Sequence, residues 1–207
     1  MALDAPVSAE KTKNWLSQLP QELLEQETQL REVMEAFYAI HPLTVGDVVK
    51  VPPLVPHSLL HGVRTIEFQT PVYERKILSF AQKVLTQQQW DTEAALQEVE
   101  LTTPPLSELE LLVKDDLHHR ELIVAFDHFV VERLHLYAGA SIELTHDNVH
   151  RLIIGVVGEF QVGEHIVSGE RALFIPASQC CLAITNKSSA TAVLLLAIPC
   201  SETLDDE

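Results

Sequence analysis

The chain has few positive charges, few cysteines and no long apolar segment. Its 207 residues include 14 Lys and Arg against 30 Asp and Glu, which gives a formal charge of −16 at pH 7. Nucleic acids and anionic membrane surfaces are bound through clustered Lys and Arg, so we expect neither as a partner. No apolar run approaches the roughly 20 residues that span a bilayer, and the first residues contain no apolar signal segment. These absences predict a cytoplasmic protein.

The three cysteines are Cys180, Cys181 and Cys200. Three cysteines cannot all pair, and adjacent cysteines rarely bond to each other, so the sequence predicts reduced thiols. Cys180 and Cys181 are interpreted as part of a buried apolar strand, because no basic residue nearby in the sequence would lower a thiol pKa and create a nucleophile.

The residues that are present describe a globular protein that begins with helices. Hydrophobic residues make up 46% of the chain and charged residues 21%, which is enough for one sizeable core or two small ones. Ser8 is a candidate N-cap of a short helix around Trp15, and Pro20 ends that helix and opens a second one. An apolar stripe at helical spacing predicts that the second helix packs on one face. The stripe consists of Leu23, Leu30, Met34 and Phe37.

From His41 the pattern changes to β-branched residues and turn signals. Residues 64–69 alternate in polarity, which predicts a strand, and residues 90–100 resemble a capped helical turn. The sequence Thr-Thr-Pro-Pro at 102–105 is the best linker candidate, and a polar stretch at 115–120 follows it. We therefore divide the chain into residues 1–105 and residues 106–207.

After Glu121 the sequence is rich in short apolar runs that are separated by Gly, Asn, Asp and Ser. Residues 122–139, 141–147, 150–176 and 181–199 read as strands joined by tight turns. Many short strands with frequent turns are typical of an antiparallel sheet that is closed or sandwiched. The fold class is therefore mainly β.

Two segments carry a family resemblance. Residues 150–178 lead an apolar strand to a hairpin turn at Gly163-Glu164 and into a second strand, which resembles the core of a cupin barrel. The other segment begins at Gly46-Asp47 and resembles the second cupin motif. Pro52 lies five residues after Asp47, and His57 lies five residues after Pro52. With helices before the first segment, the chain is similar to the C-terminal half of type I mannose-6-phosphate isomerases. The resemblance implies a bicupin-like pair of jelly-roll barrels, the first of them shortened within residues 1–105.

The resemblance also implies a site. His57 matches the zinc-binding histidine of that family, and Arg75 lies near its catalytic arginine. His61, Glu67 and Gln69 are further candidate metal ligands, and Glu67 could also act as a general base. The implied reaction is a metal-dependent aldose–ketose isomerisation of a sugar or sugar phosphate, with zinc as the expected divalent metal.

One departure from the family leaves alternatives open. The other metal ligands of the family precede the matched segment, whereas only helices precede Gly46 here, and a zinc site needs about three protein ligands. His57 and His61 could instead be polar residues at the rim of the barrel. The chain would then be a non-catalytic cupin module for binding or interaction that has lost its metal site. The second barrel offers no better ligand set, because Cys181 stands where the motif has histidine and the pair His146 and His150 flanks a turn. An incomplete first barrel would leave open sheet edges, which usually need to be covered. The N-terminal helices or a second copy of the chain in a homodimer would cover them.

Overall fold

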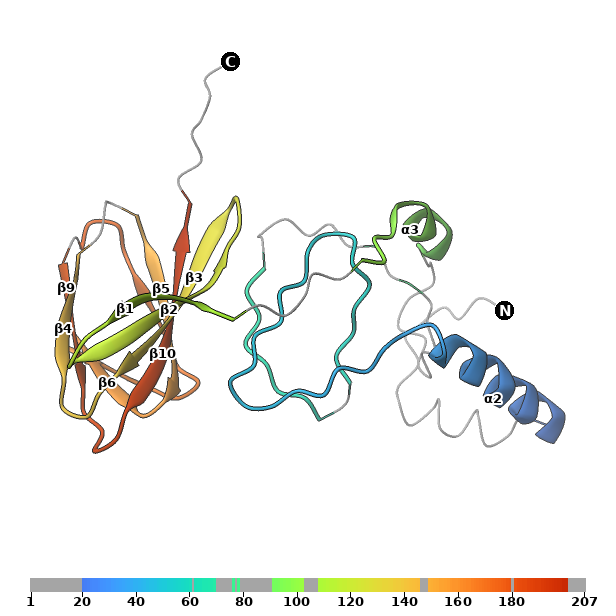
Figure 1. The fold of residues 1–207 in the computed structure, drawn as a ribbon, viewed down its shortest axis with the longest axis horizontal. Coiled ribbons are helices and arrows are strands. Elements are labelled where there is room, and N and C mark those ends of the chain that lie inside the picture. Colours follow the sequence, from blue (N-terminus) through green and yellow to red (C-terminus); the bar gives the residue numbers. More distant parts are fainter. Residues whose placement is uncertain are drawn as a thin grey trace, which may run out of the picture. The chain divides into compact units, whose positions relative to one another are not determined.

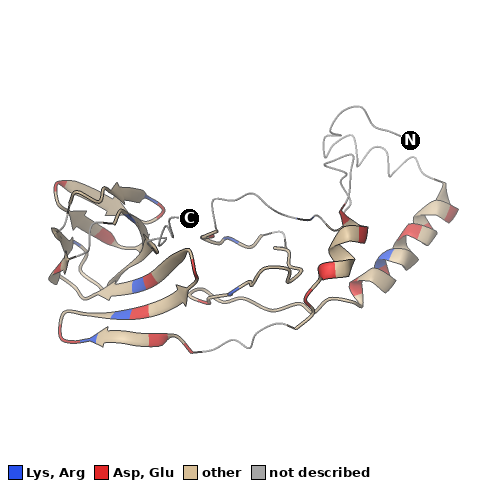
Figure 2. Cartoon of the chain, turned by 90° about the horizontal axis from the view of Figure 1, so that it is seen from above, with Lys and Arg blue, Asp and Glu red and all other residues tan. Residues whose placement is uncertain are grey.

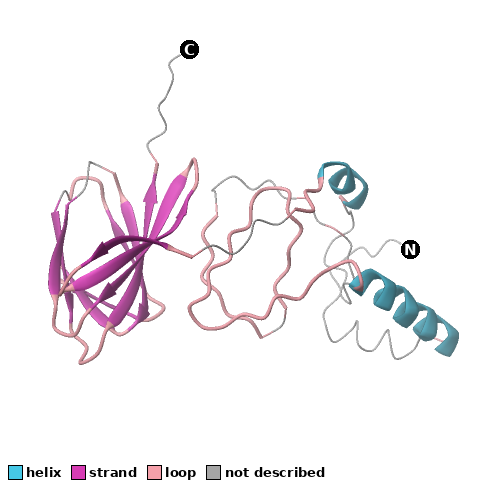
Figure 3. Ribbon diagram, viewed as in Figure 1, coloured by secondary structure: helices cyan, strands magenta, loops and turns pink. Residues whose placement is uncertain are grey.

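A computed structural model describes residues 20–60, 62–69, 76, 78, 91–102, 108–145, 149–179 and 181–200. These residues form two helices and ten strands (Figures 1 and 3). The chain divides into two compact units, of which unit 1 comprises residues 1–67 and 71–104 and unit 2 comprises residues 68–70 and 105–207.

Unit 1 contains both helices, α2 (Gln21–Glu35) and α3 (Thr92–Glu98). Pro20 precedes α2, as predicted, and its carbonyl accepts hydrogen bonds from the backbone N–H groups of Leu23 and Leu24. The predicted packing of α2 is not seen, because none of its residues is buried. Figure 2 shows that most of the charged positions on the two helices are acidic. The short helix predicted around Trp15 lies outside the described residues.

The segment between the helices contains no strand in residues 41–60 and 62–69. A turn forms where Asp47 accepts bonds from the backbone N–H and the hydroxyl of Thr44, with Gly46 at φ +101°. The strand predicted at residues 64–69 is therefore wrong: its alternating pattern has no neighbouring strand in the described residues to pair with. The described residues of this segment do not show the shortened first barrel, which stays a prediction for residues 1–105.

Unit 2 contains all the strands. They are β1 (Glu110–Lys114), β2 (His118–Ala125), β3 (Phe129–Leu136), β4 (Ser141–Thr145), β5 (Arg151–Val157), β6 (Glu159–Val162), β7 (His165–Ser168), β8 (Ala172–Ile175), β9 (Cys181–Asn186) and β10 (Ala192–Pro199). They form a six-stranded sheet in the order β1-β2-β3-β10-β5-β8 and a four-stranded sheet in the order β4-β9-β6-β7. Every pairing is antiparallel.

The strand order is that of a jelly roll. From β3 to β10 the chain passes from one sheet to the other after each strand, except at the β6–β7 hairpin, whose two strands lie in the smaller sheet. The four strands β3-β10-β5-β8 therefore face β4-β9-β6-β7, as two interlocked Greek keys require. Strands β1 and β2 extend the first sheet beyond β3. The predicted jelly-roll barrel is confirmed for this unit, and the turn predicted at Gly163-Glu164 joins β6 to β7.

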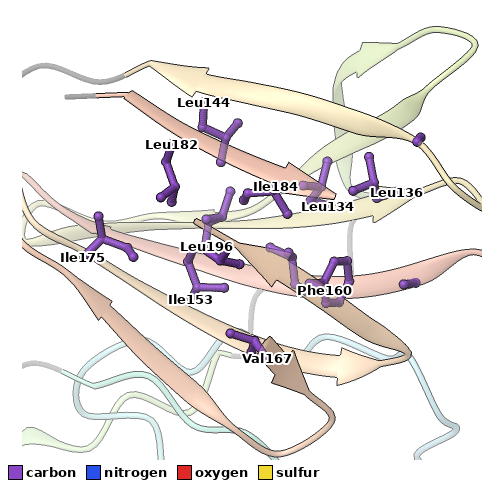
Figure 4. Packing of buried hydrophobic residues seen from close by; sticks show 14 residues of the cluster. Leu134, Leu136, Leu144, Ile153, Phe160, Val167, Ile175, Leu182, Ile184 and Leu196 are labelled. Carbon is purple, nitrogen blue, oxygen red and sulfur yellow. The ribbon is translucent and has the colours of Figure 1, made fainter. Parts of the chain in front are cut away.

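The core lies between the two sheets (Figure 4). The larger sheet contributes side chains such as Leu134, Leu136 and Leu194, and the smaller sheet contributes Phe160 and Ile184, all fully buried. Since successive side chains of a strand point to opposite faces, the even positions of β3 near Leu134 face this core. We call that face of the larger sheet its inner face, and the opposite one its outer face.

One polar side chain is buried among the described residues, and it joins two connections of the barrel. The Asn186 amide donates to the carbonyls of Leu136, Tyr137 and Ala190, and its oxygen accepts from the backbone N–H of Ser188. Because burial without partners would cost roughly 1–3 kcal/mol for each polar group, this satisfied network is compatible with an otherwise apolar core. The described interior therefore offers no metal ligands.

One sequence prediction about unit 2 needs correction, and one segment gains an assignment. Residues 118–120, at the end of the polar stretch after the linker, are the first residues of β2. Cys181, interpreted as buried, starts β9 and is exposed, with its thiol against the Glu143 carboxylate. Cys180 and His146 lie outside the described residues.

Candidate metal centre

Three potential metal ligands come together on the β2–β3 hairpin. His119 and Glu121 lie two residues apart on β2, and His135 lies on β3 directly opposite His119. One donor atom from each of the three lies within 4.8 Å of the others. We call these residues the His–Glu–His cluster. Arg133 lies opposite Glu121 and completes a block of four neighbouring polar side chains.

A β-bulge in β2 creates this register. Next to the hairpin turn, Val124 pairs with Val131, but Leu122 pairs with Glu132, so Ile123 is an extra residue in β2. Without it, His119 would lie opposite Leu136 and would point into the core, since a one-residue slip moves every side chain to the other face. The bulge therefore puts both histidines on the same face of the sheet.

That face is the outer one. His135 lies between Leu134 and Leu136 in β3, and both leucines point into the core with 0% exposure. The side chains of His135 and Glu121 are each 22% exposed and that of Arg133 is 18% exposed. The cluster is therefore partly shielded yet open to solvent, so an ion can reach it without crossing the apolar interior.

Hydrogen bonds fix the cluster from both sides. Arg133 Nε donates to Glu121 Oε2 at 2.8 Å, and His135 Nε2 lies 3.3 Å from the same oxygen. The rings of His119 and His135 are stacked with centroids 4.0 Å apart. His119 Nδ1 lies 3.3 Å from the Tyr137 hydroxyl, a contact that would leave Nε2 of this ring for a metal. Figure 2 shows the blue and red segments of two adjacent strands side by side.

The arrangement fits a small divalent ion after one adjustment. Two ligand atoms bound to zinc at its usual distances and at a tetrahedral angle lie about 3.3 Å apart. The contact between His135 and Glu121 already has that length, at 3.3 Å. The His119 ring is inclined by only 15° to that of His135, so it has to rotate out of the stack for its nitrogen to point at the same ion.

The protonation of the cluster favours metal binding. Burial lowers the pKa of His135, and the nearby His119 lowers it further, against the opposing effect of Glu121. For Glu121, burial raises the pKa, but the hydrogen bond and the charge of Arg133 outweigh burial, so the pKa lies below its ordinary value. Metals bind neutral imidazole and ionised carboxylate, and the lowered pKa values of His135 and Glu121 favour these forms of the two side chains.

Those residues that the resemblance indicated and that the structure describes are not part of a metal-ligand cluster. His57 is exposed, and its Nδ1 lies 2.9 Å from the Val55 carbonyl oxygen. Glu67 and Gln69 are also exposed, in a segment without secondary structure. His61 and Arg75 lie outside the described residues, so the ligand and catalytic roles suggested for this set stay predictions.

The chain was compared with known proteins. No protein-family model and no curated protein matches it. Among solved structures, an RmlC-like cupin from Shewanella frigidimarina has 13% identity, covers 46% of this chain and 87% of its own, and has a TM-score of 0.40. KdgF from Halomonas sp. has 16% identity over 45% of this chain and 88% of its own, with a TM-score of 0.38.

A sugar phosphate isomerase of the cupin superfamily from Silicibacter pomeroyi has 19% identity over 40% of this chain and 60% of its own, with a TM-score of 0.35. Scores this low carry no argument by themselves, so the assignment of the jelly roll rests on the strand order described above. None of the helices in the described ranges is both long and apolar enough to cross a membrane.

Proposed function

We propose that unit 2 is a metal-binding jelly-roll module that holds one divalent transition-metal ion on the outer face of its larger sheet. The observation that carries the proposal is the convergence of His119, Glu121 and His135 within 4.8 Å. Two imidazoles and one carboxylate are the protein ligands of one class of catalytic zinc site, which keeps its remaining coordination position open. Zinc is therefore the first candidate, and iron(II) is the main competitor for the same ligand set.

The position of the site separates it from the barrel interior. The buried core is apolar apart from Asn186 in the described residues, so the proposed ion does not lie between the sheets. Its ligands instead come from two strands at one end of the larger sheet. A metal site of this kind can bind a small ligand from solvent or can simply stabilise the hairpin.

The proposal is tested by equilibrium dialysis of the full chain against zinc, iron(II) and manganese(II), followed by metal analysis. We expect one zinc ion per chain and a loss of affinity of at least about tenfold for Glu121→Gln, since even outer-shell changes cost 10–100-fold. Glu132→Gln is the matched control, because Glu132 lies on the neighbouring strand but pairs with Arg120 on the inner face. Equal zinc binding by Glu121→Gln and the wild type would contradict the proposal.

A second candidate function is the metal-dependent aldose–ketose isomerisation that the resemblance implies. It is supported by the presence of a cation, the Arg133 guanidinium, beside a ligand set with open positions. A bound metal would stabilise the oxyanion that develops during proton transfer between adjacent carbons. The test is the interconversion of mannose 6-phosphate and fructose 6-phosphate by the zinc-loaded chain. The absence of turnover in a chain that binds zinc leaves the non-catalytic module as the function.

A further inference from the structure

One neighbour of the His–Glu–His cluster decides which nitrogen of His119 can face an ion. Arg133 holds Glu121, and the two histidine rings stack on each other, so neither of these contacts engages a nitrogen of His119. The hydroxyl of Tyr137 does, because it lies 3.3 Å from His119 Nδ1. Among the described residues, no other group makes a hydrogen bond with the His119 ring.

The chemistry of imidazole makes this contact important for a metal. A neutral imidazole carries its proton on one nitrogen and offers the lone pair of the other. Nδ1 of His119 faces Tyr137, so Nε2 is the nitrogen left for the ion, and the proton must then be on Nδ1. Metal-ligating histidines almost always donate this second N–H to an oxygen outside the ligand set. A tyrosine hydroxyl can accept as well as donate, so Tyr137 supplies that oxygen here.

The length of the contact allows the ring to turn. His119 has to leave its stack with His135 before its nitrogen can point at the ion, and the rings are now 4.0 Å apart. Nδ1 is bonded directly to Cγ, so a turn about the Cβ–Cγ bond moves this atom less than it moves the stacked face of the ring. The contact of 3.3 Å can therefore shorten toward the usual length of about 2.9 Å as the ring turns.

Tyr137 is itself held in place at its backbone and its ring. Its N–H donates to the Leu117 carbonyl at 2.9 Å, and its carbonyl accepts from the N–H of Ala140 at 3.0 Å. The same carbonyl accepts from the buried amide of Asn186 at 3.0 Å. The ring of Tyr137 is partly buried and packs against the core cluster. The hydroxyl is therefore presented to His119 from a fixed position.

We propose that Tyr137 is a positioning residue of the metal centre, an inference that rests on the proposed metal site. Its hydroxyl oxygen accepts from the Nδ1–H of His119 and so presents Nε2 of that ring to the ion. Tyr137 does not contact the ion and acts only through His119. The buried Asn186 network, which holds the Tyr137 carbonyl, thereby supports the metal from inside the barrel.

The first test compares the zinc affinities of the wild-type full chain and of Tyr137→Phe, measured by competition with a chromophoric chelator. Phenylalanine keeps the ring and its packing, so only the hydroxyl is lost. We expect about tenfold weaker binding, at the lower end of the range for outer-shell changes. Tyr38→Phe is the matched control, because Tyr38 belongs to unit 1, and it should keep the wild-type affinity. Circular dichroism checks that both variants are folded.

Nitrogen-15 NMR of the zinc-loaded protein separates positioning from a general loss of structure. In the wild type we expect zinc on Nε2 of His119 and a proton on Nδ1 that exchanges slowly enough with water to be observed. In Tyr137→Phe this proton should exchange too fast to be seen, while the backbone resonances of β2 and β3 stay in place. Zinc on Nδ1 of His119 in the wild type, or an equally protected proton in Tyr137→Phe, would overturn the inference.

The outcomes separate the two proposals. Equal zinc affinities of the wild type and Tyr137→Phe remove the role of Tyr137 and leave the proposed metal function intact. The absence of zinc binding to the wild type removes both.

Discussion

The substitution of one metal ligand should remove most of the stabilisation of the folded state by zinc, while the fold itself is kept. In His135→Ala, two of the three ligands of the His–Glu–His cluster remain, and the inner-face neighbours Leu134 and Leu136 keep their place in the core. Outer-shell changes at metal sites cost 10–100-fold in affinity, so the loss of a ligand should cost about 100-fold or more.

The size of the effect follows from mass action. At a free zinc concentration of 100 times the wild-type Kd, binding stabilises the folded state by about 2.7 kcal/mol. If the Kd of the variant is 100-fold higher, the same zinc concentration stabilises it by only about 0.4 kcal/mol. The difference of about 2.3 kcal/mol corresponds to a difference of roughly 10 °C in the shift of Tm for a domain of about 100 residues.

The assay is thermal unfolding of both proteins with zinc and with a chelator, and the quantity compared is the Tm shift that zinc causes in each. His118→Ala is the matched control, because His118 precedes His119 in β2, points to the inner face and pairs with Leu136. We expect the control to keep the wild-type shift. A full zinc shift in His135→Ala, or its loss in His118→Ala, would refute the assignment of the ligands.

The remaining predictions concern the scaffold and its protonation. Asn186→Ala should lower the free energy of unfolding by roughly 2–4 kcal/mol, because it leaves buried carbonyl groups without donors. Urea titration measures this change, and a cost under about 0.5 kcal/mol would show that water replaces the amide. Gly155→Ala should cost about 1–3 kcal/mol, because its Cβ would lie 2.3 Å from the Ser168 carbonyl oxygen, and an unchanged urea midpoint would contradict this. In metal-free protein the pKa of His135 is lowered from 6.5 on folding, so the unfolded state binds the proton more readily. The contribution of His135 to stability is therefore complete above pH 6.5 and is lost as the pH falls through its folded pKa. The stability of the wild type relative to His135→Gln should rise as the pH is raised from the folded pKa of His135 to 6.5, and a fall with rising pH would contradict the lowered pKa.

Much of the barrel was predictable because its strands obey local rules. In residues 150–176, apolar runs are separated by turns that contain glycine. The β6–β7 hairpin turns at Gly163-Glu164, as this pattern predicts. The start of α2 after Pro20 and the helical turn at α3 follow from equally local signals. The same rules failed for residues 64–69, because an alternating pattern makes a strand only where another strand pairs with it.

The His–Glu–His cluster could not be predicted from the sequence, because it depends on the register between β2 and β3. His119 and His135 are opposite each other only because of the bulge at Ile123, and a hairpin counted without the bulge puts Leu136 opposite His119. The motif spacing around His57 was easier to notice, but it identifies only one possible metal ligand. The sequence signal for the cluster was the pair of alternating patterns His119-x-Glu121 and Arg133-x-His135. These patterns indicate a cluster only when the register that pairs β2 with β3 is known.

The most direct test of the central claim is anomalous diffraction at the zinc edge from crystals of the full chain grown with zinc. We predict one strong peak on the outer face of the larger sheet, about 2 Å from a nitrogen of His119, a nitrogen of His135 and an oxygen of Glu121. A peak between the two sheets or at His57, with none at this hairpin, would contradict the account.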